Sequence, residues 1–140
     1  MAVSHHPRLG AVVLCDFSKG FVPPEMVKRR PAIVISPKIS VRAGLCTVVP
    51  ISTEVPRVIL AYHVELTGLD LPPPWDTGPN WVKADMVYAV SLSRIDLFRR
   101  RSEADGKRIY DEKTLPPDDL LKVRKAVLCG LGMMNLTKPL

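Results

Sequence analysis

Short apolar runs, separated by polar stretches rich in proline and glycine, dominate the first hundred residues of the chain. They predict strands at residues 9–15, 31–36, 45–52, 58–66 and 81–92, with shorter strands at 94–98 and 107–111. Pro31 is expected at the first position of its strand, where no amide proton is needed, and the 81–92 strand is expected to bend near Asp85. Within 58–66 the residues alternate, so that His63 and Glu65 share the polar face.

The pattern changes near residue 115, where apolar residues recur at the spacing of an amphipathic helix. Pro116 or Pro117 suits its first turn, Asp118 and Asp119 suit its positive end, and Gly130 and Gly132 indicate where it stops. Several short strands followed by one helix predict a mainly β fold, a small curled sheet or barrel with a C-terminal α-helix. We expect a single domain over residues 1–140, with residues 1–8 as a flexible terminus.

Composition and charge narrow the function classes. The formal net charge of +6 favours nucleic acid or an acidic protein as partner, and no run of residues has the length of a membrane helix. Three widely spaced cysteines, Cys15, Cys46 and Cys129, predict buried free thiols in a reducing cytoplasm. The sequence has no Cys-x-x-Cys pair or His-Glu-x-x-His motif, so we expect neither a metal site nor a cofactor.

Polar residues gather where predicted strands begin or end. The three groups are Arg29-Arg30 before Pro31, Ser52-Thr53 after Pro50, and Lys83 with Asp85. Taken singly, each group is typical of a solvated strand end, a turn or a surface ion pair. If the curled sheet brings them together, arginine, hydroxyl and lysine suit a phosphodiester, and catalysis would depend on positioning and charge stabilisation. His63 is expected to be structural.

These blocks of sequence resemble the MazF/PemK toxins of bacterial toxin–antitoxin systems. The resemblance is carried by "GAVVLCDF", "EMVKRRPAIVIS", "CTVVPIST", "YHVEL" and "KADMVYAVSLSRID", in this order over residues 9–98. It implies an SH3-like barrel of the MazF/PemK/CcdB type that forms a homodimer. It also implies a metal-independent, sequence-selective endoribonuclease that cuts single-stranded RNA by attack of the ribose 2′-hydroxyl.

The resemblance also assigns residues. The arginine of the family matches Arg30 and its hydroxyl residue matches Ser52, so both are predicted to be catalytic. Predicted RNA-binding residues are Glu25, Arg29, Thr53, Lys83 and Asp85. Pro24 stands where some members carry a histidine or glycine, so no histidine acid or base is carried over, and Lys83 replaces an arginine.

The implied partners are single-stranded RNA and a cognate antitoxin with an acidic, partly disordered tail, in the cytoplasm. Two alternatives remain open on the sequence. One is a non-catalytic barrel toxin of the gyrase-poisoning CcdB type. The other is an SH3-like module that binds RNA or protein without cleavage, with a strong dependence on salt.

Overall fold

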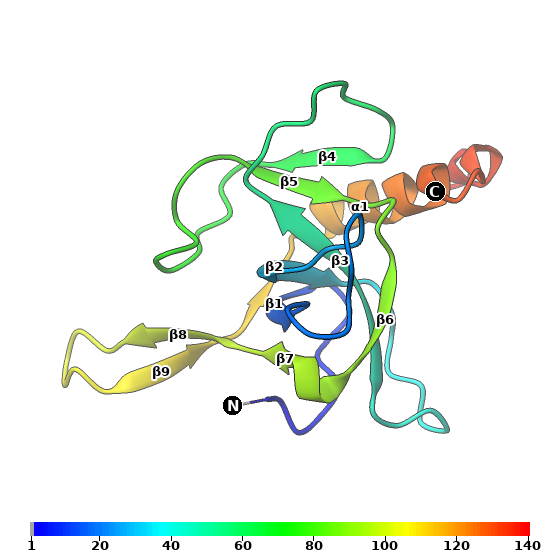
Figure 1. Ribbon diagram of the computed structural model, residues 1–140. Coiled ribbons are helices and arrows are strands. Elements are labelled where there is room, and N and C mark those ends of the chain that lie inside the picture. The colour runs from blue at the N-terminus through cyan, green and yellow to red at the C-terminus, as the bar shows by residue number, and fades with distance from the viewer. Residues whose placement is uncertain (1) are drawn as a thin grey trace.

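A computed structural model describes residues 2–140, with the backbone alone at residue 101. Ten strands precede one α-helix, α1 (Pro117–Gly130), and short 3-10 turns lie at Leu92–Arg94 and Met134–Thr137 (Figure 1). The strands are β1 (Ala11–Asp16), β2 (Arg29–Val34), β3 (Leu45–Ser52), β4 (His63–Leu66), β5 (Asn80–Lys83), β6 (Tyr88–Ser91), β7 (Ile95–Asp96), β8 (Phe98–Arg101), β9 (Arg108–Asp111) and β10 (Lys113–Thr114).

Eight of these strands form one strongly curled, antiparallel sheet. Its order is β10-β1-β2-β3-β5-β4, while β6 pairs with β3 and β7 pairs with β1. The long strand β3 pairs with β6 along its first half and with β5 at its end, so it passes through the bend of the sheet. The prediction of a mainly β, curled sheet with a C-terminal helix is confirmed.

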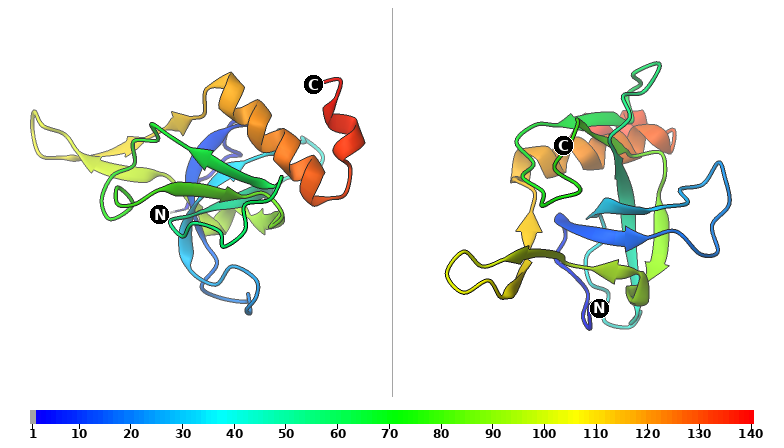
Figure 2. Two further views of the ribbon diagram at one scale, coloured as in Figure 1. Left: turned by 90° about the horizontal axis from the view of Figure 1, so that it is seen from above. Right: turned by 60° about the vertical axis from the view of Figure 1, so that its left-hand side comes forward.

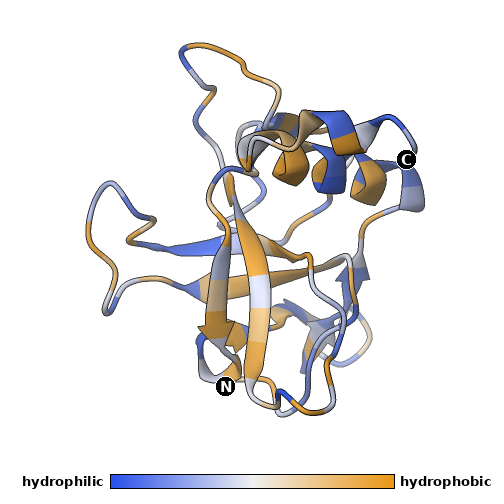
Figure 3. Ribbon diagram, turned by 90° about the vertical axis from the view of Figure 1, so that its right-hand side faces the viewer, coloured by the Kyte–Doolittle hydropathy of each residue, from blue (hydrophilic) through white to orange (hydrophobic). Residues whose placement is uncertain are grey.

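Both faces of the central strands are buried, which explains their continuous apolar sequences. On one face, residues including Leu14, Ile33, Val49, Ile51 and Val82 pack with Val123 and Ala126 of α1. Figure 2 shows α1 crossing this side of the sheet. On the other face, a second cluster is built from alternate residues of the same strands, and Figure 3 shows the central strands as largely apolar. Its main members are Val13, Cys15, Phe17, Ala32, Val34, Cys46, Val48, Val90 and Ile95.

The helix begins and ends as the sequence predicts. Pro117 is its first residue, with Asp118 and Asp119 in the first turn, and it ends at Gly130. Gly130 lies against the turn after β5, where a Cβ atom on it would come within 3.1 Å of the Asp85 Cα atom. Within residues 2–140 no helix combines the length and the apolar character needed to cross a membrane.

Several details differ from the expectations, the first at the start of β2. β2 begins at Arg29, because Arg29 and Arg30 pair with Asp16 and Cys15, so Pro31 is its third residue. The ladder tolerates Pro31 because pairing with β3 starts only at Ala32.

The expected 58–66 strand is confined to His63–Leu66, since a turn closes when the His63 amide bonds to the Leu60 carbonyl oxygen at 3.0 Å. The expected 81–92 strand is interrupted at Ala84–Asp85, where the bend was expected, by a turn in which the Met86 amide bonds to the Lys83 carbonyl oxygen.

Cys129 is only half-buried, unlike the buried Cys15 and Cys46; all three cysteines are free thiols. At the N-terminus, the Val3 amide bonds to the Ile95 carbonyl oxygen at 2.9 Å. Met1 lies outside the described residues, and the flexibility of residues 1–8 stays a prediction.

Strands β8 and β9 form a separate two-stranded hairpin that projects from the sheet (Figures 1 and 2). At its base, Arg100 Nε bonds to the Asp111 carboxylate at 2.6 Å, which ties the two strands together. The Arg99 guanidinium lies 5.7 Å from the centre of the Tyr110 ring. The expected 107–111 strand is therefore the second arm of this hairpin, as β9, and its partner β8 begins at Phe98, the last residue of the expected 94–98 strand.

Candidate functional site

The alternation of β2 and β3 places the two predicted catalytic residues on the same face of the sheet. Ala32 pairs with Pro50 across these antiparallel strands, and this is the last pair of the ladder. Arg30 and Ser52 each lie two residues beyond it, on the same side of their strands as Ala32 and Pro50. Residues opposite each other in an antiparallel pair point to the same face, so both side chains lie on the face away from α1.

Both side chains retain hydrogen-bond donors that the fold does not use. Arg30 is half-buried, and its Nε atom is shielded from solvent without a hydrogen-bond partner. Ser52 is 6% exposed, and its Oγ accepts a bond of 3.1 Å from the Glu54 amide. This bond occupies a lone pair of the hydroxyl and leaves its O–H free to donate, so the pair presents donors suited to an anion.

Strands β5 and β4 continue this polar face. Ser52 pairs with Trp81, and Trp81 pairs with Glu65 on β4. Two residues further along β5, Lys83 pairs with His63. The second apolar cluster covers β1, β2, β3 and β6 but includes no residue of β4 or β5, so the polar face begins where this cluster ends.

We define the donor face by Arg30, Ser52, Trp81, Lys83 and His63. Thr53 follows Ser52 directly and is exposed. Asp85 lies in the turn after β5, where the alternation of the strand no longer applies, and is close enough to His63 to act on its pKa. Of the predicted residues, the fold thus brings Arg30, Ser52 and Lys83 together on one face, with Thr53 and Asp85 at its edges.

Arg29 and Glu25 lie elsewhere. Arg29 precedes Arg30 in the same strand and therefore points to the opposite face, where its guanidinium lies 3.6 Å from the Asp96 carboxylate. It lines a cavity of about 360 Å³ together with Pro73, Trp75 and Arg99. The Glu25 carboxylate accepts a bond of 3.1 Å from the Val22 amide and closes a turn within the loop before β2.

That loop is held firmly beside β1 and β6. Phe17, Phe21 and Tyr88 form a cluster with ring centres 5.2–5.4 Å apart. The Tyr88 hydroxyl accepts a bond of 3.0 Å from the Met26 amide. The Arg94 guanidinium donates to the Asp16 and Lys19 carbonyl oxygens at 3.0 and 2.7 Å. The long loop between β1 and β2 is therefore anchored at both ends.

His63 is held in one orientation and one tautomer. Its Nδ1 accepts a bond of 3.0 Å from the Leu60 amide, which places the proton of the neutral ring on Nε2. Partial burial lowers the pKa of His63, the positive charge of Lys83 lowers it further, and Asp85 opposes both. The neutral ring is thereby favoured, and it offers an N–H donor beside Lys83.

The sequence analysis did not assign Trp81, and it took His63 as structural. The period-two pattern in residues 80–83 and 63–66 could have placed both on the face of Lys83, because alternate residues of a strand share a face. The pairing of Trp81 with Ser52 could not be found in this way, since it depends on the register between two distant strands.

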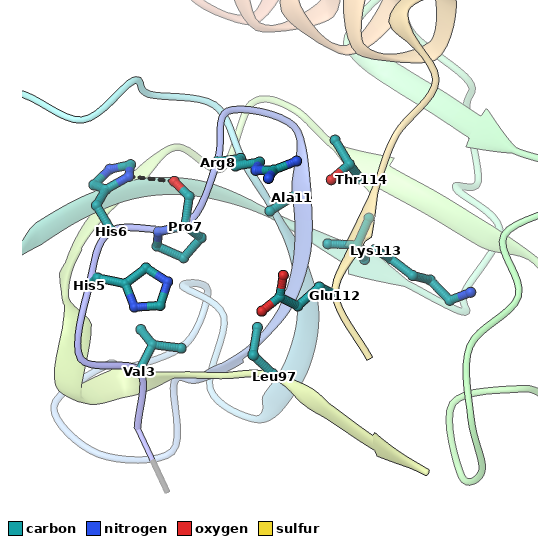
Figure 4. Close-up of a pocket in the computed structure, with 11 residues that line it drawn as sticks. Val3, His5, His6, Pro7, Arg8, Ala11, Leu97, Glu112, Lys113 and Thr114 are labelled. Atoms are coloured by element: carbon teal, nitrogen blue, oxygen red, sulfur yellow. Dashed lines mark hydrogen bonds between the residues drawn. The ribbon is translucent and has the colours of Figure 1, made fainter. Parts of the chain in front are cut away.

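A separate cavity of about 230 Å³ lies beside the N-terminal segment and β10. Its lining includes His5, His6, Arg8, Glu112 and Lys113 (Figure 4). It contains none of the predicted site residues. Within residues 2–140, no three His, Cys, Asp or Glu side chains are grouped closely enough to hold a metal ion.

The geometry defines a class of protein, a small curled β-sheet with a cationic donor face turned away from its single long helix. The sequence matches the PemK-like, MazF-like toxin family of type II toxin–antitoxin systems over residues 8–128, and the chain belongs to this family. The predicted family is thereby confirmed.

The chain is also similar to individual known proteins. The putative protein YifN of Escherichia coli strain K12 is 28% identical, over 97% of this chain and 99% of its own. The crystal structure of MazF from Deinococcus radiodurans has a TM-score of 0.61 at 22% identity, with 93% of this chain and 100% of that chain covered. A mycobacterial endoribonuclease, solved with its cognate antitoxin, has a TM-score of 0.60 at 18% identity and covers 91% of this chain and 96% of its own. These structures show that the fold is of the MazF type.

Proposed function

We propose that the protein is the toxin of a type II toxin–antitoxin system and acts as a metal-independent endoribonuclease on single-stranded RNA. The observation that carries the proposal is that Arg30 and Ser52 share one face at neighbouring strand ends and keep donors that no protein group uses. Membership of the PemK-like, MazF-like toxin family supports it. So do fold relatives named as endoribonucleases.

In the proposed reaction the ribose 2′-hydroxyl attacks the neighbouring phosphorus atom. The O2′–P bond forms and the P–O5′ bond breaks, while the 2′ oxygen loses a proton and the 5′ oxygen gains one. The products are a 2′,3′-cyclic phosphate and a free 5′-hydroxyl. Because the atoms and charges of the RNA balance by themselves, the protein has to supply position, charge stabilisation and help in moving a proton.

The donor face supplies these requirements. The Arg30 guanidinium stabilises the charge that develops on the pentacovalent phosphorane and assists proton transfer, and the Ser52 hydroxyl donates to a phosphate oxygen. Lys83 lies on the same face and attracts the RNA backbone. Thr53 and Asp85 border this face and position nucleotides next to the cut. Arg29 and Glu25, which lie off it, contact RNA further from the cut or a protein partner.

The net positive charge of the chain also bears on its protein partner. The net charge of +6 suits an antitoxin with an acidic tail that folds on the toxin surface and blocks the donor face. A mycobacterial relative has been solved in complex with its cognate antitoxin, and the Deinococcus radiodurans relative has been solved as MazE-MazF. We further propose a homodimer in the cytoplasm, to be checked by the native mass of the purified toxin.

Substitution of Arg30 tests the activity. The parent protein, Arg30→Ala and the control Arg42→Ala, which removes an exposed arginine from another loop, are each incubated with a mixed RNA pool in the presence of EDTA. We expect Arg30→Ala to lose about 10²–10³ in rate, as is typical when a charge-stabilising donor is removed. Arg42→Ala should cleave like the parent.

Mapping the cut ends tests the mechanism in the same samples. Cyclic phosphate and 5′-hydroxyl ends are expected, and 3′-hydroxyl with 5′-phosphate ends would contradict the cyclisation route. Equal activity of Arg30→Ala and the parent would refute the role of Arg30. If the protein were instead a non-catalytic barrel toxin or an RNA-binding module, the parent would not cleave RNA after the antitoxin is removed.

A further inference from the structure

Trp81 is buried in a way that neither apolar core explains. It is 7% exposed, yet it belongs to neither of the two core clusters of the described residues. Its indole Nε1 is shielded from solvent and has no hydrogen-bond partner. A core tryptophan normally pairs this N–H, because a buried donor without a partner costs about 1–3 kcal/mol.

Among the described residues, the buried side-chain nitrogen and oxygen atoms without a partner are only two, Trp81 Nε1 and Arg30 Nε. Both residues lie on strands next to the β3 strand that carries Ser52. Trp81 pairs with Ser52 across β3 and β5, and Arg30 lies on β2, two residues beyond the last β2–β3 pair, Ala32 with Pro50. When this register is continued over those two residues, the two unpaired donors fall on either side of one free hydroxyl, in a row across three neighbouring strands.

The spacing of this row suits one anion with several acceptor oxygens. Cβ atoms of residues directly opposite each other in an antiparallel sheet are about 4.5–5.5 Å apart. Donors from adjacent strands can therefore converge on the oxygens of a single phosphate group at hydrogen-bond distance. The two non-bridging oxygens of a phosphodiester carry enough lone pairs to accept from all three donors at once.

We propose that the Trp81 indole N–H is a third donor to the RNA phosphate held by Arg30 and Ser52, and so a catalytic residue. The identity of the ligand as RNA rests on the proposed function, whereas the anion site itself does not. Since both unpaired nitrogens are shielded, binding requires a small movement of the neighbouring loops. These loops meet where Thr53 approaches Gly78, on which a Cβ atom would lie 3.7 Å from the Thr53 Cβ.

Trp81→Phe is the direct test, because it removes the N–H and keeps an aromatic ring. Trp75→Phe is the matched control, since the chain has two tryptophans and Trp75 lies in the proline-rich loop between β4 and β5. On an RNA with a mapped cut site, Trp81→Phe should lower kcat/KM by about 10- to 100-fold, the value of a hydrogen bond to a charged group. Trp75→Phe should stay close to the parent.

A second readout uses the unmutated protein, so it does not depend on how a variant folds. The indole N–H signals are observed by ¹⁵N NMR and assigned by their loss in the two variants. An RNA with a 2′-deoxyribose at the cut site, which cannot cyclise, is then added. We expect the Trp81 signal to shift and the shift to vanish in Arg30→Ala, while Trp75 changes little.

The outcomes separate the two proposals. Cleavage by Trp81→Phe with the parent's kcat and KM, or RNA binding that leaves the Trp81 signal in place, overturns the role of Trp81. If the parent neither binds nor cleaves RNA, the proposed function fails. The unmutated protein is then titrated with inorganic phosphate, and the Trp81 indole signal shows whether the anion site exists. A shift of the Trp81 signal supports that site, and its absence overturns it.

Discussion

Arg29 and Arg30 are chemically identical neighbours, and the sheet gives them different surroundings. Arg30 lies on the face of Ser52 and keeps an unused donor, while Arg29 lies near the Asp96 carboxylate on the opposite side of the sheet. The strand, not the side chain, makes this distinction. A role assigned to one arginine therefore cannot be passed to the other.

His63 predicts a dependence of stability on pH. Its folded-state pKa lies below its ordinary value of 6.5, because burial and Lys83 disfavour the charged ring. The unfolded chain therefore binds a proton more readily than the folded protein near that pH, and stability falls as the pH drops below 6.5. The hydrogen bond from the Leu60 amide to His63 Nδ1 increases this loss of stability in acid, because protonation of Nδ1 breaks the bond.

The measurement is urea unfolding between about pH 5 and 8, a range around the ordinary pKa of histidine. We expect the parent to lose stability toward acid and His63→Asn, which offers an acceptor near the position of Nδ1, to show a flatter profile. The Asp16 carboxyl, whose pKa is lowered chiefly by the Ser18 hydrogen bonds, acts only at more acidic pH. Identical profiles for the two proteins would contradict the assignment.

At the scale of elements, the end of α1 supports the turn that follows β5. Gly130 allows this close approach, because a Cβ atom would lie 3.1 Å from the Asp85 Cα and 3.4 Å from the Ala84 carbonyl oxygen. Both neighbours are backbone atoms and cannot rotate away. The helix therefore helps to fix the strand end that carries Lys83 and the turn that carries Asp85.

Two effects compete in Gly130→Ala. Alanine gains up to about 1 kcal/mol of helix propensity over glycine, and less at a helix end, whereas overpacking typically costs about 1–3 kcal/mol. We expect a net loss of about 1 kcal/mol in the free energy of unfolding, together with weaker RNA cleavage through displacement of the turn. Denaturant unfolding measures the loss of unfolding free energy, and Arg124→Ala on the exposed side of the same helix is the control. A stabilised Gly130→Ala would show that the turn yields easily.

Element type followed from the sequence wherever a pattern was long enough to determine it. The 45–52 strand and the 117–130 helix were placed correctly, because their apolar residues must meet the cores. The 58–66 strand was overestimated, since alternation cannot reveal that the His63 ring would bond to the Leu60 amide. β10 was missed because it has two residues and exists only by pairing with β1.

For the site, the residue types were predictable and their grouping was not. Arg30 and Ser52 came from a family resemblance, and the β2–β3 register then gave their relative placement. Trp81 looked like an ordinary apolar position, and only its pairing with Ser52 and its unpaired nitrogen distinguish it. Arg29 was grouped with Arg30 because contiguity in sequence hides the alternation of a strand.

At the scale of the whole molecule, the net charge of +6 predicts that RNA binding weakens as salt rises. For single-stranded RNA, each neutralised phosphate contributes about 0.7 to the slope of log K against log salt concentration. Arg30→Ala should therefore lower the slope by about that amount, since it removes one phosphate contact. The control Arg42→Ala has the same net charge and should keep the slope of the parent.

Binding of the 2′-deoxy-substituted RNA is measured by fluorescence anisotropy at several salt concentrations. Equal slopes for the parent and both variants would show that Arg30 makes no phosphate contact. If the slope were reduced equally in both variants, the RNA would be attracted by the overall charge of the protein and not held at a defined site.

The alternation of β2 also bears on which genetic changes the protein can survive. The segment reads Lys28-Arg29-Arg30-Pro31, so deletion of either arginine codon gives the same shortened chain, Lys-Arg-Pro. In that chain an arginine still stands directly before the proline, and the missing residue has to be taken up by the loop before β2. Replacement of Arg30 keeps the length and leaves a different side chain at that place. Deletion of one arginine codon therefore retains the arginine next to Pro31, whereas replacement of Arg30 removes it.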